Sequence, residues 1–197
     1  MKLKLLSIAL AAAGSVVMSG HAAAAAPDDG AMLAGTCFGC HGTLGSSVGP
    51  ASPTIAGMAT DTFLEGMKAY KEGKRPATVM DRIAKGYTDE EFKLMADYFV
   101  KQKFVRFPQK ADDGLAKKGK DLHKEHCEKC HVDGGTKDED GSSILAGQWL
   151  PYLQFAMEDF LGEKREMPKK MASQVKKVQE KDPKGIDALL HFYASQK

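Results

Sequence analysis

The chain lacks the features of several common protein classes. After residue 18 it has no apolar run near the length of about 20 residues that spans a bilayer. It contains no Gly-x-Gly-x-x-Gly run, so it has no dinucleotide-binding fingerprint for FAD or NAD. Apolar and polar residues do not alternate over any useful length, which argues against β-strands. We therefore expect no membrane span, no flavin site in this chain and no sheet.

The chain also lacks a large excess of charge of one sign. Its formal net charge is +2, from 28 basic and 26 acidic residues. Residues 1–26 hold two lysines and no acid, so the remainder balances 26 basic against 26 acidic residues. Nucleic-acid binding requires a positive field that neutralises phosphates. We expect no nucleic-acid partner, and we expect partner choice to depend on a local patch.

The N-terminus has the three parts of a secretory signal peptide. Lys2 and Lys4 form a basic start, residues 5–18 are apolar, and small residues at 21–26 precede Pro27. We predict that residues 1–26 are a cleaved signal peptide, which places the mature chain in the periplasm. The alternative is an uncleaved anchor.

Cysteine is scarce, and all four cysteines fall into two identical short motifs. Each is a C-x-x-C-H run, and together they comprise Cys37, Cys40, His41, Cys127, Cys130 and His131. The two thiols of such a run can each form a thioether to a haem vinyl group, and the histidine that follows ligates the iron. The sequence therefore predicts two covalently bound haem c groups, held by all four cysteines.

Two other types of site use the same cysteine spacing. A C-x-x-C pair can be a redox dithiol or half of a structural zinc site. The two pairs here are too far apart for a compact zinc ribbon, and a histidine follows both. A thioredoxin-like dithiol would need a βαβ context, which is absent. The haem interpretation fits better than either alternative.

The sequence repeats itself with a shift of 90 residues. This shift carries the first motif onto the second and holds without a gap over about 40 residues. A polar stretch at 108–114 separates the halves. We predict an all-α fold of two tandem domains, 27–110 and 111–197, each packed around one covalent haem. Each half is small for a self-sufficient core, and a buried haem would add a large apolar body.

Helical signals occur at five places. They are residues 30–36, residues 115–125, a helix opened by Pro151, a helix capped by Thr88 and a helix that starts near residues 182–183. Pro151 suits a first helical turn because proline lacks only an N–H that would be unpaired there. Thr88 and Glu91 have the spacing of a capping box.

The sixth iron ligand decides whether each haem transfers electrons or binds a substrate. An iron with protein ligands on both faces has no open site, and methionine raises its potential. The repeat selects two of the 10 methionines: Met80 follows Arg75, and Met171 follows Arg165 with one inserted residue. The predicted iron ligands are His41 and Met80 for haem 1 and His131 and Met171 for haem 2, with Met167 as the alternative to Met171.

Longer runs resemble a known family. They are residues 47–53, 82–87, 126–132, 144–149 and 167–173. These runs resemble the dihaem cytochrome subunit of flavocytochrome c sulfide dehydrogenase, over nearly the whole mature chain. More distantly the chain is similar to the cytochrome c4 group, which consists of two class I cytochrome c domains in tandem.

The resemblance implies a periplasmic electron-transfer subunit that is not an enzyme by itself. A separate subunit that contains FAD would oxidise sulfide, and this chain would pass the electrons to a soluble cytochrome c. One alternative is a free-standing dihaem carrier of the cytochrome c4 type that serves a terminal oxidase. A second alternative is a haem enzyme, such as a thiosulfate dehydrogenase or a peroxidase, with an open iron site.

The resemblance also suggests partners for the haem histidines. In class I cytochromes c a proline carbonyl accepts a hydrogen bond from the second ring nitrogen, and Pro50 has a suitable place after His41. The second half has Glu139 and Asp140 at the shifted position, so His131 needs another carbonyl, and the two haems should differ in potential. We interpret residues 137–140 as a solvated loop, with a docking or tuning patch as the alternative. The remaining histidines that we interpret as surface or helix-end residues are His123, His126 and His191.

Overall fold

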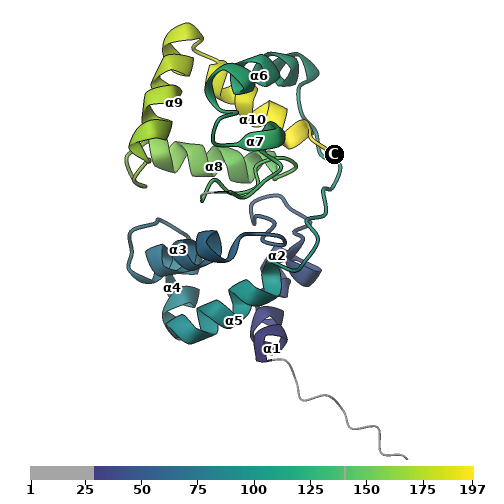
Figure 1. The fold of residues 1–197 in the computed structure, drawn as a ribbon, viewed down its shortest axis with the longest axis vertical. Helices are drawn as coiled ribbons and strands as arrows, with labels where there is room; N and C mark the ends of the chain where they lie inside the picture. The colour runs from purple at the N-terminus through teal and green to yellow at the C-terminus, as the bar shows by residue number, and fades with distance from the viewer. Residues whose placement is uncertain (1–28, 140) are drawn as a thin grey trace, which may run out of the picture.

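A computed structural model describes residues 29–139 and 141–197. The predicted signal peptide and Asp140 lie outside these residues. Within them the structure contains helices and no strands, which confirms the predicted all-α class. No described helix combines the length and apolar composition that a membrane crossing requires. Figure 1 shows two stacked helical lobes, with α1 to α5 in one and α6 to α10 in the other.

The first lobe is built from three longer helices and several short turns. Its elements are α1 (Asp29–Gly35), α2 (Phe38–His41), the 3-10 turn η1 (Thr43–Gly45), α3 (Thr60–Lys71), α4 (Met80–Ile83), the 3-10 turn η2 (Ala84–Gly86) and α5 (Asp89–Phe99). Its core centres on Phe92, Met95 and Phe99, which are fully buried. The predicted capping box is present: the Glu91 N–H donates to the Thr88 hydroxyl, and the Thr88 N–H donates to the Glu91 carboxylate.

The second lobe has longer helices. Its elements are α6 (Asp113–His126), α7 (Val132–Gly135), α8 (Leu150–Leu161), α9 (Lys169–Lys181) and α10 (Gly185–Ser195). Helices α6 and α10 cross closely at Gly119, where an added Cβ would lie 2.0 Å from the Ala188 carbonyl oxygen. A side chain at Gly119 would therefore push apart the two helices that frame the second core. Pro151 lies in the first turn of α8, as predicted.

The 90-residue repeat is visible in the backbone hydrogen bonds. The Gly45 carbonyl accepts from Ile55 and Ala56, and the Gly135 carbonyl accepts from Leu145 and Ala146. A second pair of bonds runs from Gly57 to the Phe99 carbonyl and from Gly147 to the Tyr193 carbonyl, each at 2.8 Å. The same loop thus closes onto the last helix of each lobe, and Phe99 and Tyr193 are structural equivalents.

Reciprocal bonds join the lobes through buried groups. The Thr54 N–H donates to Gln148 Oε1 at 3.0 Å, and Gln148 Nε2 donates to the Thr54 carbonyl at 2.7 Å. Both residues are almost fully buried. Nearby, Trp149 Nε1 donates to the Ser47 carbonyl at 3.0 Å, and the indole ring lies against Gly49.

The loop at 137–140 also takes part in this contact. Asp138 is half-buried and accepts from the Ala59 N–H at 2.9 Å and from the Thr62 hydroxyl at 2.7 Å. The interpretation of this segment as a solvated loop is therefore wrong for Asp138, although Lys137 and Glu139 are exposed. The missed feature is a carboxylate that accepts from Ala59 and Thr62 of the other half of the chain as well as from Ser143 of its own half.

Candidate haem sites

The first motif forms one helical turn that gathers its three functional side chains. The His41 N–H bonds to the Cys37 carbonyl at 2.9 Å. Cys37 is half-buried, Cys40 is exposed and His41 is buried. His41 Nδ1 lies 2.8 Å from the Pro53 carbonyl oxygen, not from that of Pro50, so the predicted acceptor was wrong by three residues.

This contact fixes the ring orientation of His41. Because the carbonyl oxygen can only accept, Nδ1 carries the proton and Nε2 keeps a free lone pair for a metal. Burial lowers the pKa of His41, which keeps the imidazole neutral, as a metal ligand requires.

The second motif has the same turn in a different setting. The His131 N–H bonds to the Cys127 carbonyl at 2.9 Å, the same distance as in the first lobe. His131 Nδ1 is buried without a hydrogen-bond partner, although the Ser142 carbonyl lies near enough to raise the pKa of the ring. Burial lowers that pKa more strongly, and the nearby His123 adds to the decrease. His131 is thus the less firmly oriented of the two histidines.

The first cysteine of each motif lacks the lowered pKa of a reactive dithiol. All four are free thiols in this structure. Burial raises the pKa of Cys37, and it raises the pKa of Cys127 to about 11. A nucleophilic dithiol needs a lowered pKa. In the part of the chain that the structure describes, no group of three or more His, Cys, Asp or Glu side chains could hold a metal ion by themselves.

The candidate methionine ligands all lie in the segments after the repeated arginines. Met80 is the first residue of α4, is half-buried and packs against the first core. Met171 is half-buried in the first turn of α9. Met167, also half-buried, precedes α9 and lines a depression between the end of α8 and α9. The choice of Met171 over Met167 therefore stays a prediction based on the repeat.

The charges of two arginines, Arg75 and Arg165, test whether the structure suits the negatively charged propionates of a haem. The Arg75 guanidinium lies 4.7 Å from the centre of the Tyr70 ring, and that of Arg165 lies 4.2 Å from the Phe160 ring. Arg75 also donates to the Tyr152 hydroxyl of the other lobe at 3.2 Å. Burial and the positive charge of Arg75 lower the pKa of Arg165 to about 10.

Neither arginine forms a salt bridge with a carboxylate among the described residues. Asp159 offsets part of the positive charge at Arg165 but does not pair with it directly, and a haem carries two propionates that could neutralise both cations. The charges of this region and the Cys and His positions therefore fit two haem groups.

One histidine differs from its expected position. His123 is 1% exposed and is among the largest fully buried side chains, so its interpretation as a surface or helix-end residue is wrong. It bonds to Tyr193, which is 70 residues away in the sequence, and to Glu128, which follows the end of α6. His126 is the last residue of α6, whereas His191 lies inside α10 and not at its end; both are partly buried. A local sequence pattern does not reveal a partner 70 residues away.

Known proteins share both the sequence and this arrangement. No family model matches the chain. It is 30% identical over 158 residues to a cytochrome c4 of Thiocapsa roseopersicina, a match that covers 73% of this chain and 81% of the relative. The chain belongs to the cytochrome c4 family. The structure of reduced recombinant cytochrome c4 from Pseudomonas stutzeri agrees with a TM-score of 0.74 at 25% identity, over 88% of this chain and 100% of that one.

A shorter match is more similar in sequence. The chain is 44% identical over 70 residues to the cytochrome subunit of sulfide dehydrogenase from Chlorobaculum tepidum. This match covers 36% of the chain and 63% of that relative, so it spans less than two thirds of the relative's length. The resemblance to both families is thereby confirmed, as is the fold of two tandem cytochrome c domains.

Membership of the cytochrome c4 family gives the two motifs their cofactor. The chain is an electron-transfer cytochrome with two covalently bound haem c groups. When bound, each haem iron takes up and releases one electron. The residues that would hold the groups are the four cysteines and the two motif histidines, and burial of His41 and His131 supplies neutral imidazoles.

Proposed function

We propose that this chain is the periplasmic dihaem subunit of a sulfide dehydrogenase. It accepts electrons from a partner subunit that contains FAD and passes them to a soluble cytochrome c. The observation that carries the proposal is the 44% identity over 70 residues to the cytochrome subunit of sulfide dehydrogenase, a higher local identity than the 30% over 158 residues to cytochrome c4. The runs at 82–87 and 144–149, which carry the sequence resemblance, support the same family.

The number of haems suits a flavin partner. A reduced flavin holds two electrons and each haem iron accepts one, so two haems in one subunit can empty the flavin. The chain has no dinucleotide-binding run, so the FAD belongs to the partner. His41 with Met80, and His131 with Met171, saturate both irons in this proposal, which leaves sulfide no site on this chain.

The first lobe offers an apolar surface to such a partner. Leu44 and Val48 follow His41 and are exposed, Val48 by 73%. Val79 and Ile83 flank Met80 and are also exposed. In the second lobe the repeat replaces Leu44 by Gly134 and Val48 by the bonded Asp138. We therefore place the permanent contact with the flavoprotein on the first lobe, because stable interfaces are more apolar than transient ones.

Rapid mixing of the complex with sulfide tests the proposal. We expect the flavin to be reduced first and the haems next, and we expect the haems of the isolated chain to be reduced far more slowly. Val79→Glu should weaken the complex, and Val100→Glu, the same change at an exposed valine at the end of α5, is the matched control. Fast reduction of the isolated chain by sulfide would instead assign catalysis to this chain and favour the haem-enzyme alternative.

A second candidate function has its own support. The cytochrome c4 match covers 81% of the relative, and the solved cytochrome c4 is covered completely. A free-standing carrier of this type would serve a terminal oxidase and would need no flavoprotein. Purification from periplasm, with flavin and haem quantified, separates the two. Haem without stoichiometric flavin, together with rapid oxidation by oxidase-containing membranes, would favour the carrier.

A further inference from the structure

A buried polar cluster adjoins the second haem motif. His123 Nδ1 lies 2.9 Å from the Tyr193 hydroxyl, and His123 Nε2 bonds to Glu128 Oε2. The other oxygen of Glu128 accepts from the Asp133 N–H at 2.9 Å. Glu128 belongs to the attachment loop between Cys127 and His131. Its carboxylate therefore links this loop to His123, which precedes the loop, and to Asp133, which follows it.

The proton positions follow from the chemistry of the groups. A carboxylate only accepts, so His123 Nε2–H donates to Glu128. Nδ1 is then the acceptor, and the Tyr193 hydroxyl donates to it. The Tyr193 hydroxyl also lies close to Cys127, one of the two cysteines that attach haem 2, and its ring centre lies 6.4 Å from that of His131. The cluster thus adjoins the sulfur atom that would carry haem 2.

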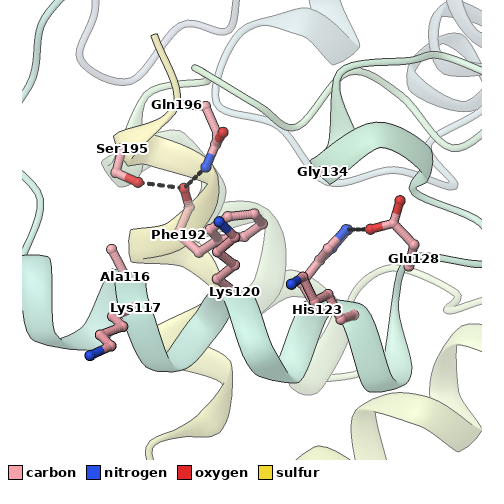
Figure 2. A pocket seen from close by; sticks show the side chains of 10 residues that line it. Ala116, Lys117, Lys120, His123, Glu128, Gly134, Phe192, Ser195 and Gln196 are labelled. Atoms are coloured by element: carbon pink, nitrogen blue, oxygen red, sulfur yellow. Dashed lines mark hydrogen bonds and ion pairs between the residues drawn. The ribbon is translucent and has the colours of Figure 1, made fainter.

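Figure 2 shows where the cluster meets solvent. His123 on α6 points toward Glu128 in the wall of a cavity of about 440 Å³, with Lys120 beside it. The charged groups that surround His123 are Glu128, Lys120 and Lys124 at this cavity, and His131 on its inner side. Side-chain exposure is 1% for His123 and 43% for Glu128, so the carboxylate connects a buried base with the surface.

The first lobe provides an internal comparison. The 90-residue shift places Leu33 at the position of His123 and Phe38 at that of Glu128. Phe99 is the equivalent of Tyr193, because each accepts the bond from its lobe's glycine at 2.8 Å. All three residues of the first lobe are apolar, and Phe38 and Phe99 make an edge contact at 6.5 Å. The two haem motifs therefore share one backbone but differ in their immediate polarity.

We propose that His123, Glu128 and Tyr193 are positioning residues that lower the midpoint potential of haem 2 relative to haem 1. A carboxylate held beside the attachment loop stabilises the more positive ferric state of the nearby iron. His123 orders this carboxylate, and the Tyr193 hydroxyl orders His123. The first lobe has hydrocarbon at all three places and has no such anion. The proposal does not depend on which partner supplies the electrons.

Potentiometric titration of the isolated dihaem protein tests the proposal. Glu128→Gln should shift the potential of haem 2 upward and leave that of haem 1 unchanged, with haem 2 identified by nuclear Overhauser contacts to the Tyr193 ring, which lies against His131. Glu128→Asp restores the charge and should return the potential toward the original value. Glu180→Gln on α9 makes the same chemical change at an exposed site of the same lobe and should shift neither potential.

Haem content, measured by mass for each variant, separates a failure of attachment from a failure of tuning. Tyr193→Phe keeps the ring, and we expect it to give a smaller upward shift of haem 2, because the carboxylate loses part of its order. If Glu128→Gln does not retain haem 2, Tyr193→Phe decides the question. An unchanged haem 2 potential, equal shifts of both haems, or the same shift in Glu180→Gln would overturn the proposal.

Discussion

Gln148 provides the sharpest test of how the lobes are joined. Its amide makes two hydrogen bonds to the backbone of Thr54, at 3.0 and 2.7 Å, and its side chain is 4% exposed. Thr54 is 2% exposed, so water cannot replace these bonds without opening the contact. We expect Gln148→Ala to leave one buried N–H and one buried carbonyl without a partner.

The cost follows from the number of orphaned groups. A buried donor or acceptor left unsatisfied costs about 1–3 kcal/mol, so two give a loss of about 2–4 kcal/mol in the free energy of unfolding, allowing for partial relaxation. For a chain of this size, that corresponds to a decrease of about 5–15 °C in the melting temperature. Gln148→Glu keeps the acceptor but places an oxygen against the Thr54 carbonyl, so its loss should be at least as large.

Urea unfolding of the holoprotein, followed by Soret absorbance and far-ultraviolet circular dichroism, measures this loss. Gln179→Ala, the same change at an exposed position of α9, is the control. A loss for Gln148→Ala below about 0.5 kcal/mol, the range of ordinary surface substitutions, would refute the reasoning. It would show that the contact between the lobes opens in solution.

Two further predictions concern the haems. Met80→Ala and Met171→Ala should each lower one midpoint potential, because methionine favours the reduced iron. Each should also weaken the near-infrared band of methionine-ligated ferric haem. The same effects from Met167→Ala instead of Met171→Ala would place the one-residue insertion elsewhere. Mass spectrometry should find two haem adducts per chain, and Cys127→Ala should remove one and unfold mainly the second lobe, whereas retention of two adducts in that variant would contradict the thioether assignment.

Local signals in the sequence predicted much of the fold. The Thr88 capping box and the Pro151 helix start depend on residues within one turn, and both are present. Helix α9 was missed, although Met171, Val175 and Val178 recur at helical spacing, because lysines dominate the segment. Helix α3 was also not predicted, although its buried residues Phe63 and Met67 lie four positions apart, as on one face of a helix.

The contacts around the motifs could not be predicted in the same way. Pro50 and Pro53 both follow His41, and only the path of the loop decides which carbonyl faces the ring. His123 is buried because Tyr193 and Glu128 satisfy it, and Tyr193 comes from the last helix. Such positions depend on the tertiary fold, which brings residues together from distant parts of the chain.

The bonds between the lobes carry a consequence for the direction of electron flow. Ala59 of the first lobe bonds to Asp138 of the second. The repeat equivalent of Ala59 is Trp149, and that of Asp138 is Val48. Trp149 contacts Ser47 and Gly49, the two neighbours of Val48. The lobes therefore meet as a pseudo-symmetric pair, in which each presents the same edge to the other. Perfect symmetry would give electrons no preferred haem. In a dimer of identical subunits, every substitution alters both haem environments. In a duplicated chain, a substitution can alter the environment of one haem alone, so that electrons acquire a preferred haem.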